Sequence, residues 1–177
     1  MRKKSFWGYL ILSVWVMSWG CRAQKSGVEM SYQRIFEIPS GLSAIATHHI
    51  VFNDVAPDTA IFFNQVSISS ADVVAIEPRA MQIQAMFPGS GGLGFIRQIE
   101  VSMSAPDAPS LGTKILYFRD DVPLNTGDRI DLVANNADVK HLLLQKRFKI
   151  DIKFQTRETS QNNIDARFDW TFFARTE

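Results

Sequence analysis

The 177-residue chain carries 19 lysines and arginines against 18 aspartates and glutamates. This balance lacks the basic surplus with which proteins neutralise nucleic-acid phosphates, so nucleic acid is not an expected partner. The chain has one cysteine, Cys21, which excludes an internal disulfide. We therefore expect packing and hydrogen bonds alone to hold the fold.

Residues 1–20 have the features of a bacterial export signal. Three basic residues at positions 2–4 precede an uncharged, largely apolar run over residues 6–20. That run is shorter than the roughly 20 residues of a bilayer-spanning helix. The sequence predicts cleavage between Gly20 and Cys21. Because three basic residues leave with the signal, 16 remain against 18 acidic residues, a net charge of −2.

The segment Ser18, Trp19, Gly20, Cys21 resembles the lipobox of bacterial lipoproteins, in which a small residue precedes a cysteine that is lipidated. The resemblance implies that Cys21 becomes the first mature residue and carries the acyl chains of a membrane anchor. A lipidated thiol would also explain an unpaired cysteine in an exported chain. Arg22 resembles the residue that directs lipoproteins to the outer membrane, so we expect a periplasm-facing position. Ordinary cleavage, giving a soluble periplasmic or secreted protein, is the alternative.

After a short tether over residues 21–27, residues 28–177 are predicted to form a single domain of alternating strands. Residues 50–52 are apolar on both faces, which indicates a central strand. Pro78 is expected to break one region into two short strands. The expected strands cover residues 28–38, 45–55, 73–77, 81–87, 95–103, 113–118, 129–134, 148–154 and 164–172.

Two short helices are expected among these strands. One covers residues 58–66 with Asp58 as its cap, although this segment would also suit an edge strand. The other follows Asn136 as its cap, and its apolar face is formed by Val139, Leu142 and Leu143. The pattern predicts a mostly β fold, an antiparallel β-sandwich of about eight to nine strands with one or two short helices.

The strongest alternation lies in residues 148–154 and 164–172, which we expect to pair as a hairpin with Phe154 opposite Ile164. This register sets Asp151 opposite Arg167. It also sets Lys153 opposite Asp165 and Lys149 opposite Asp169. Each exposed pair of opposite charges contributes only a few tenths of a kcal/mol. Trp170, the only tryptophan after residue 19, is expected to be buried.

The G-x-G-x-x-G pattern of dinucleotide-binding turns occurs once, at Gly89, Gly91 and Gly94. That motif requires a helix directly after it, whereas residues 95–103 alternate as a strand. We interpret the glycines as an inter-strand loop.

No cofactor or metal site is expected. His48 and His49 are adjacent in a predicted strand and point to opposite faces, and His141 is the remaining histidine. Oxygen ligands of the kind that calcium prefers do gather along one stretch, but such residues also form turns. They are Asp120, Asp121, Asn125, Asp128 and Asp131.

The sequence contains no G-x-S-x-G elbow and no evident pairing of a nucleophile with a histidine. We expect a membrane-tethered, non-enzymatic binding or assembly module of the bacterial envelope that has an envelope protein as partner. The alternatives are a saccharide- or peptide-binding lipoprotein and an envelope hydrolase. The candidate interaction surfaces are the apolar cluster Ile61, Phe62 and Phe63, which could instead plug an open end of the sandwich, and the loop of Gly89, Gly91 and Gly94.

Overall fold

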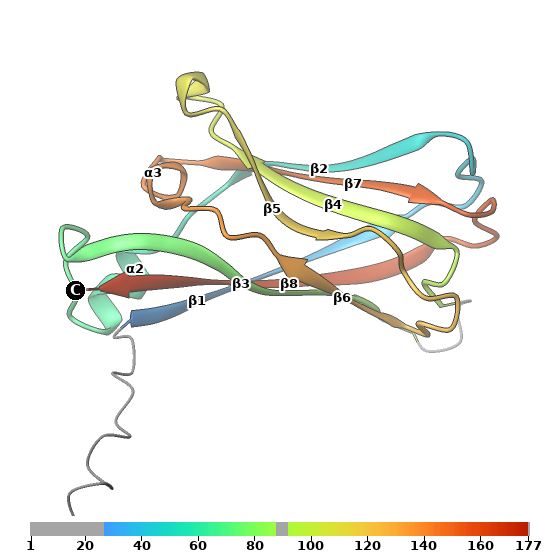
Figure 1. Ribbon diagram of the computed structural model, residues 1–177, viewed down its shortest axis with the longest axis horizontal. Coiled ribbons are helices and arrows are strands. Elements are labelled where there is room, and N and C mark those ends of the chain that lie inside the picture. Colours follow the sequence, from blue (N-terminus) through green and yellow to red (C-terminus); the bar gives the residue numbers. More distant parts are fainter. Residues whose placement is uncertain (1–26, 88–91, 177) are drawn as a thin grey trace, which may run out of the picture.

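Eight antiparallel strands curl into a sandwich in the computed structural model, which describes residues 27–87 and 92–176 (Figure 1). The strands are β1 (Gly27–Ile38), β2 (Thr47–Val55), β3 (Val73–Ala85), β4 (Ile96–Ser104), β5 (Thr113–Arg119), β6 (Arg129–Ala134), β7 (Phe148–Thr156) and β8 (Ile164–Thr176). One layer has the order β1-β8-β3-β6 and continues through β5-β4-β7-β2 into the other. The predicted antiparallel sandwich is confirmed. The export signal and Cys21 lie outside the described residues.

The structure corrects two predictions about strands. Pro78 does not divide β3; the register with β8 shifts between Pro78 and Ala80, and this bulge accommodates a residue that has no N–H to donate. β2 is an edge strand of the described sheet and not a central one, since it pairs with β7 alone. Val51 is accordingly 39% exposed.

The predicted hairpin between residues 148–154 and 164–172 is wrong. β7 pairs with β2 and β4, whereas β8 pairs with β1 and β3, so the two strands lie in different layers (Figure 1). Their apolar rows are both buried in the core between the layers. Burying two such rows contributes several kcal/mol, which outweighs the few tenths offered by each exposed charge pair.

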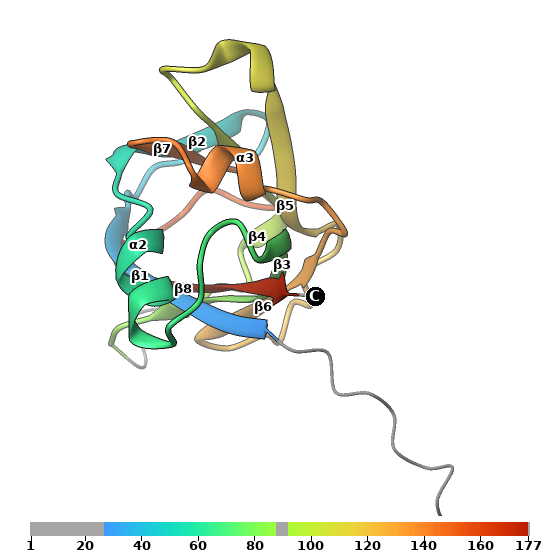
Figure 2. The same cartoon turned by 90° about the vertical axis from the view of Figure 1, so that its left-hand side faces the viewer.

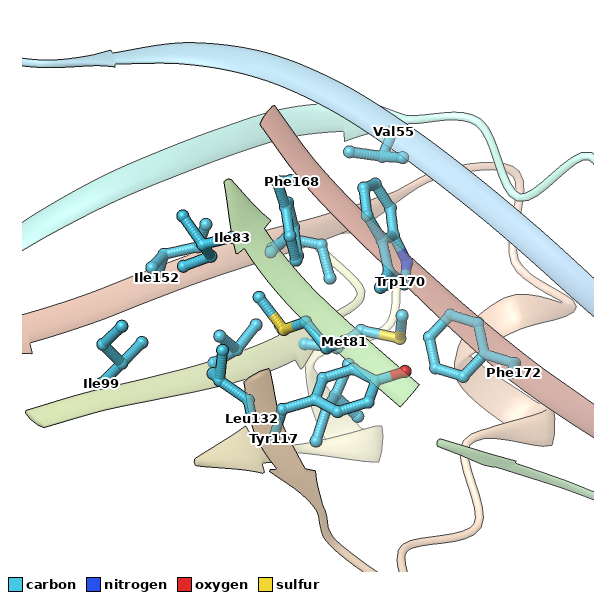
Figure 3. Packing of buried hydrophobic residues seen from close by; sticks show 14 of the residues in the cluster. Val55, Met81, Ile83, Ile99, Tyr117, Leu132, Ile152, Phe168, Trp170 and Phe172 are labelled. Carbon is cyan, nitrogen blue, oxygen red and sulfur yellow. The ribbon is translucent and has the colours of Figure 1, made fainter. Parts of the chain in front are cut away.

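β8 supplies the centre of the core through Phe168, Trp170 and Phe172, each at most 1% exposed (Figure 3). The rings of Phe168 and Trp170 stack with centroids 4.2 Å apart, and Tyr32 of β1 stacks on Trp170 at 5.3 Å. Such pairs add about 0.5–1.5 kcal/mol beyond area burial. The predicted burial of Trp170 is confirmed, and its Nε1 finds no hydrogen-bond partner among the described residues.

The first predicted helix exists as α2 (Thr59–Gln65), which lies against β1 on the side where β1 and β2 form the sheet edges (Figure 2). The hydroxyl of Tyr32 donates to the carbonyl of Pro57 just before this helix. Asp58 does not cap α2 through its side chain. It adopts a left-handed conformation, with φ 50°, and its backbone carbonyl accepts the N–H groups of Ile61 and Phe62.

The second helix is the short α3 (Lys140–Leu143), beside which Val139, Leu142 and Leu143 are buried as predicted. Asn136 is not its cap; Val139 occupies the N-cap position, without a side-chain hydrogen bond to the helix. Oδ1 of the preceding Asp138 accepts the N–H of Lys140 at 2.9 Å and that of Ile76 at 3.1 Å. A 3₁₀ turn, η2 (Pro109–Leu111), precedes β5. Within the described residues, no helix combines the length and apolar character needed to cross a membrane.

Candidate functional site

A shallow trough crosses the outer face of the layer formed by β1, β8 and β3. Its floor is one rung of short side chains, with Ser31 opposite Thr171 and Thr171 opposite Ala80. The next rung forms a wall of longer polar side chains, with Gln33 and Gln82 on either side of Asp169. The trough has a volume of about 560 Å³.

The trough follows from the alternation of these strands. Core residues such as Trp170 and Phe172 point inward, so Asp169, Thr171 and Phe173 point outward along β8. Thr171, with its short side chain, lies between the longer Asp169 and Phe173. A second hollow of about 190 Å³ shares Gln82, Asp169 and Thr171 and extends to β6.

Hydrogen bonds hold Asp169 and Gln82 of the polar wall in place. The Nε of Arg167 donates to Oδ2 of Asp169 at 2.8 Å, and the Nε2 of Gln82 donates to the same oxygen at 3.1 Å. The Nη2 of Arg167 donates to Oε1 of Gln84 at 3.0 Å. Because these side chains fix one another, a ligand would meet polar groups that are already ordered.

The charged side chains that line the two hollows are paired. Arg167 pairs with Asp169, and on β6 the Nη2 of Arg129 lies 2.6 Å from Oδ1 of Asp131. Each of these carboxylates therefore has a guanidinium beside it, and neither sign dominates the lining. Such a surface does not select its ligand by net charge.

The outer face of the other layer holds a histidine–carboxylate pair, in which Nδ1 of His49 lies 3.0 Å from Oδ1 of Asp151. Ser102, on β4, is the register partner of Asp151 on β7. His49 lies on β2, which flanks β7 on the side opposite β4. A nucleophilic triad needs the histidine between hydroxyl and carboxylate. Here the carboxylate stands in the middle, so this order cannot relay a proton from serine to histidine.

The structure separates the residues considered for metal binding. His48 packs its ring on Phe154 at 5.5 Å, on the face opposite His49, and the adjacent histidines thus diverge as predicted. Asp121 contacts Arg157, and Asp131 contacts Arg129. In residues 27–87 and 92–176, no three His, Cys, Asp or Glu side chains gather closely enough to hold a metal ion.

The apolar cluster Ile61, Phe62 and Phe63 is divided between core and surface. Phe63 is 3% exposed and belongs to the core, so its assignment to an interaction surface is corrected. Phe62 is partly buried, with its ring 5.5 Å from that of Tyr32. Ile61 remains 56% exposed. Two of the three residues thus help to close the sandwich, the alternative that the sequence also allowed.

Gly94 lies at a tight backbone crossing. A Cβ added to it would lie 2.3 Å from the carbonyl oxygen of Leu124. Beside it, the N–H of Leu93 donates to the carbonyl of Gly127 at 2.7 Å. β4 begins at Ile96, so a strand and not a helix follows Gly94, as the sequence predicted. Gly89 and Gly91 lie outside the described residues.

Sequence reasoning missed the trough. Alternation shows that Ser31, Gln82 and Asp169 face outward, but it cannot show that β8 lies between β1 and β3. Their adjacency depends on pairing between strands that are far apart in the chain.

No protein-family model matches the chain, and no curated protein matches it. Three solved structures are viral and only distantly similar. Turnip yellow mosaic virus is 10% identical with a TM-score of 0.29, over 85% of this chain and 95% of that one. The decameric BFDV capsid protein is 12% identical with a TM-score of 0.35, over 86% and 100%. Desmodium yellow mottle tymovirus is 10% identical with a TM-score of 0.26, over 87% and 90%. With TM-scores this low, the likeness carries no argument about function.

Proposed function

We propose that this chain is a lipid-tethered module of the bacterial cell envelope that binds another envelope component without covalent chemistry. The observation that supports this proposal is the trough on the outer face of β1, β8 and β3. Its polar wall is ordered by the bonds of Asp169 with Arg167 and Gln82, and its floor is open to solvent at Ser31. This arrangement suits reversible binding.

The proposed anchor places this face near a membrane. Cys21 carries the lipid, and β1 begins at Gly27. The six Cα steps between these residues span at most about 20 Å. Ser31 lies in the same strand, so the trough would meet partners close to the periplasmic surface of the outer membrane. A soluble periplasmic or secreted module is the alternative if Cys21 is not lipidated.

An envelope hydrolase is the less favoured function. Ser102, the register partner of Asp151, lies on the side of Asp151 away from His49, so these three residues do not have the order of a catalytic triad. In the trough, Asp169 accepts two hydrogen bonds from side chains of the wall. The geometry therefore favours recognition over catalysis.

Photo-crosslinking in the native host tests the proposal. A diazirine amino acid at Ser31 places the probe on the trough floor, and one at Gln98 places it on the outer face of the other layer as a matched control. We expect a discrete adduct from Ser31 that is absent from Gln98 and weakened by Cys21→Ser. Equal labelling from both positions, or none from either, would contradict a binding role for the trough.

A further inference from the structure

We infer that the trough binds a neutral, hydroxyl-rich saccharide. This inference rests on the proposed function and names the chemical class of the bound component. It is argued from the charge, hydrogen-bonding groups, position and size of the trough.

The charge balance of the trough favours a neutral ligand. Arg167 is neutralised by Asp169 at 2.8 Å, and Arg129 by Asp131 at 2.6 Å. An anionic ligand would need a guanidinium free of its carboxylate, and a cationic ligand would need the reverse. A neutral polar ligand leaves both pairs intact and uses the remaining donors and acceptors.

The hydrogen-bonding groups match the hydroxyls of a sugar. The trough exposes planar amide and carboxylate groups on Gln33, Gln82 and Asp169, and the hydroxyl group of Ser31. Vicinal hydroxyls donate and accept at once, so side chains that offer both functions in fixed positions can pair with them. Asp169 is held by Arg167 and Gln82, which lowers the ordering cost of binding.

The position of the trough argues against an extended peptide. Peptides commonly add to a free sheet edge, where backbone N–H and C=O groups are available. The trough instead lies on a sheet face, and its central strand β8 is already paired with β1 and β3. Only side chains are therefore available to bind a ligand in the trough. This favours a molecule with many hydroxyl groups over an extended peptide backbone.

The size is compatible with this class. The hollow of about 560 Å³ lies within the range of small-molecule sites, roughly 300–1,000 Å³.

A glycan array tests the inference with the processed full chain in detergent. The probes are neutral oligomers of glucose, mannose, galactose and N-acetylglucosamine, together with acidic oligogalacturonate. We expect retention of at least one neutral oligomer. Calorimetry with that oligomer should then show at least a tenfold weaker affinity for two variants. Gln82→Ala removes a polar group of the wall, and Ser31→Trp fills the floor.

Gln98→Ala is the matched control, because it removes an amide from the outer face of the other layer and should leave the affinity unchanged. Far-UV circular dichroism checks that each variant is folded. Retention of oligogalacturonate alone, no retention of any neutral oligomer, or equal affinities in all variants would overturn the inference. If Ser31 still crosslinks a protein while no glycan binds, the saccharide inference fails and the proposed binding function stands.

Discussion

The hydroxyl of Tyr117 in β5 donates a 2.6 Å hydrogen bond to the carbonyl oxygen of Thr171 in β8, directly beneath the trough floor. This bond lies where the β3–β8 register shifts between Pro78 and Ala80. At the same place, the N–H of Ala80 donates to Oγ1 of Thr171 at 3.2 Å. The two hydroxyl groups thus supply hydrogen bonds at a bulge, where the regular ladder is interrupted.

Tyr117→Phe should therefore destabilise the fold by about 1–3 kcal/mol, because it leaves a carbonyl near the core without its donor while changing the packing little. Urea unfolding followed by Trp170 fluorescence measures the difference. Phe118→Leu, a change on the outer face of the same strand, is the control and should cost less. An unchanged midpoint for Tyr117→Phe would show that the bond contributes nothing to stability.

Alkaline pH should weaken the fold through two tyrosines. Burial raises the pKa of Tyr32 and of Tyr117 well above the ordinary tyrosine value, and the charge of Asp58 adds to the effect at Tyr32. Above about pH 10 the unfolded chain loses these protons while the folded chain keeps them. Their contribution is thus complete below about pH 10 and is lost as the pH rises toward the folded pKa values. Thermal unfolding between pH 8 and 11 should show a smaller decline for Tyr32→Phe combined with Tyr117→Phe than for the unaltered chain.

The sequence predicted strands well because period-two alternation is a local property. β6 covers residues 129–134 as expected, and β1 differs from its expected range by one residue. Strand pairing is not local. The opposite charges of Asp151 and Arg167 suggested a hairpin, yet Asp151 contacts His49 and Arg167 contacts Asp169. Weak exposed charge pairs could not reveal which layer each apolar row would enter.

The candidate site was less predictable than the fold for the same reason. Ser31 and Ala80 are distant in sequence and meet the same residue, Thr171, because β8 lies between their strands. In the cluster Ile61 to Phe63, composition suggested a surface, but helical geometry turns Phe63 inward and leaves Ile61 outside. A single sequence contains no signal that would order the strands.

Arg157 should be more important to stability than an exposed arginine. Its Nη1 donates to the carbonyl of Ile96 at 2.5 Å, and its Nη2 donates to the carbonyl of Val122 and to Oδ1 of Asp121. Lysine lacks the planar fork that reaches these acceptors together. We expect Arg157→Lys to lower the free energy of unfolding by about 1–3 kcal/mol.

Arg129→Lys is the matched control for Arg157→Lys. Arg129 pairs with Asp131 on the surface, where both side chains are more than half exposed, and such pairs contribute about 0–1 kcal/mol. Chemical denaturation of both variants gives the comparison. Equal losses would show that the loop contacts of Arg157 do not stabilise the fold.

Gly94→Ala should disturb the loops around residues 92–94 and 124–127. The new methyl carbon would lie 2.3 Å from the carbonyl oxygen of Leu124, so one backbone segment must move. A steric change of this kind costs about 1–3 kcal/mol. Hydrogen exchange should report faster exchange at the N–H of Leu93, which bonds to Gly127. Ser90→Ala, a change in the same glycine-rich stretch, is the control. If the N–H of Leu93 exchanges as slowly in Gly94→Ala as in the unaltered chain, the close approach of Gly94 to the Leu124 carbonyl is contradicted.

Cys21→Ser should separate the proposed anchor from the fold. Without the thiol, no thioether to lipid can form, and the chain should leave the membrane fraction or accumulate with its signal uncleaved. Because residue 21 precedes β1, which begins at Gly27, the unfolding midpoint of the domain should not change. Mass spectrometry of the mature N-terminus provides the direct measurement, since two or more acyl chains are needed for stable attachment. Membrane retention and normal processing of Cys21→Ser, or a mature cysteine without acyl chains, would exclude the lipid anchor and favour a soluble exported protein.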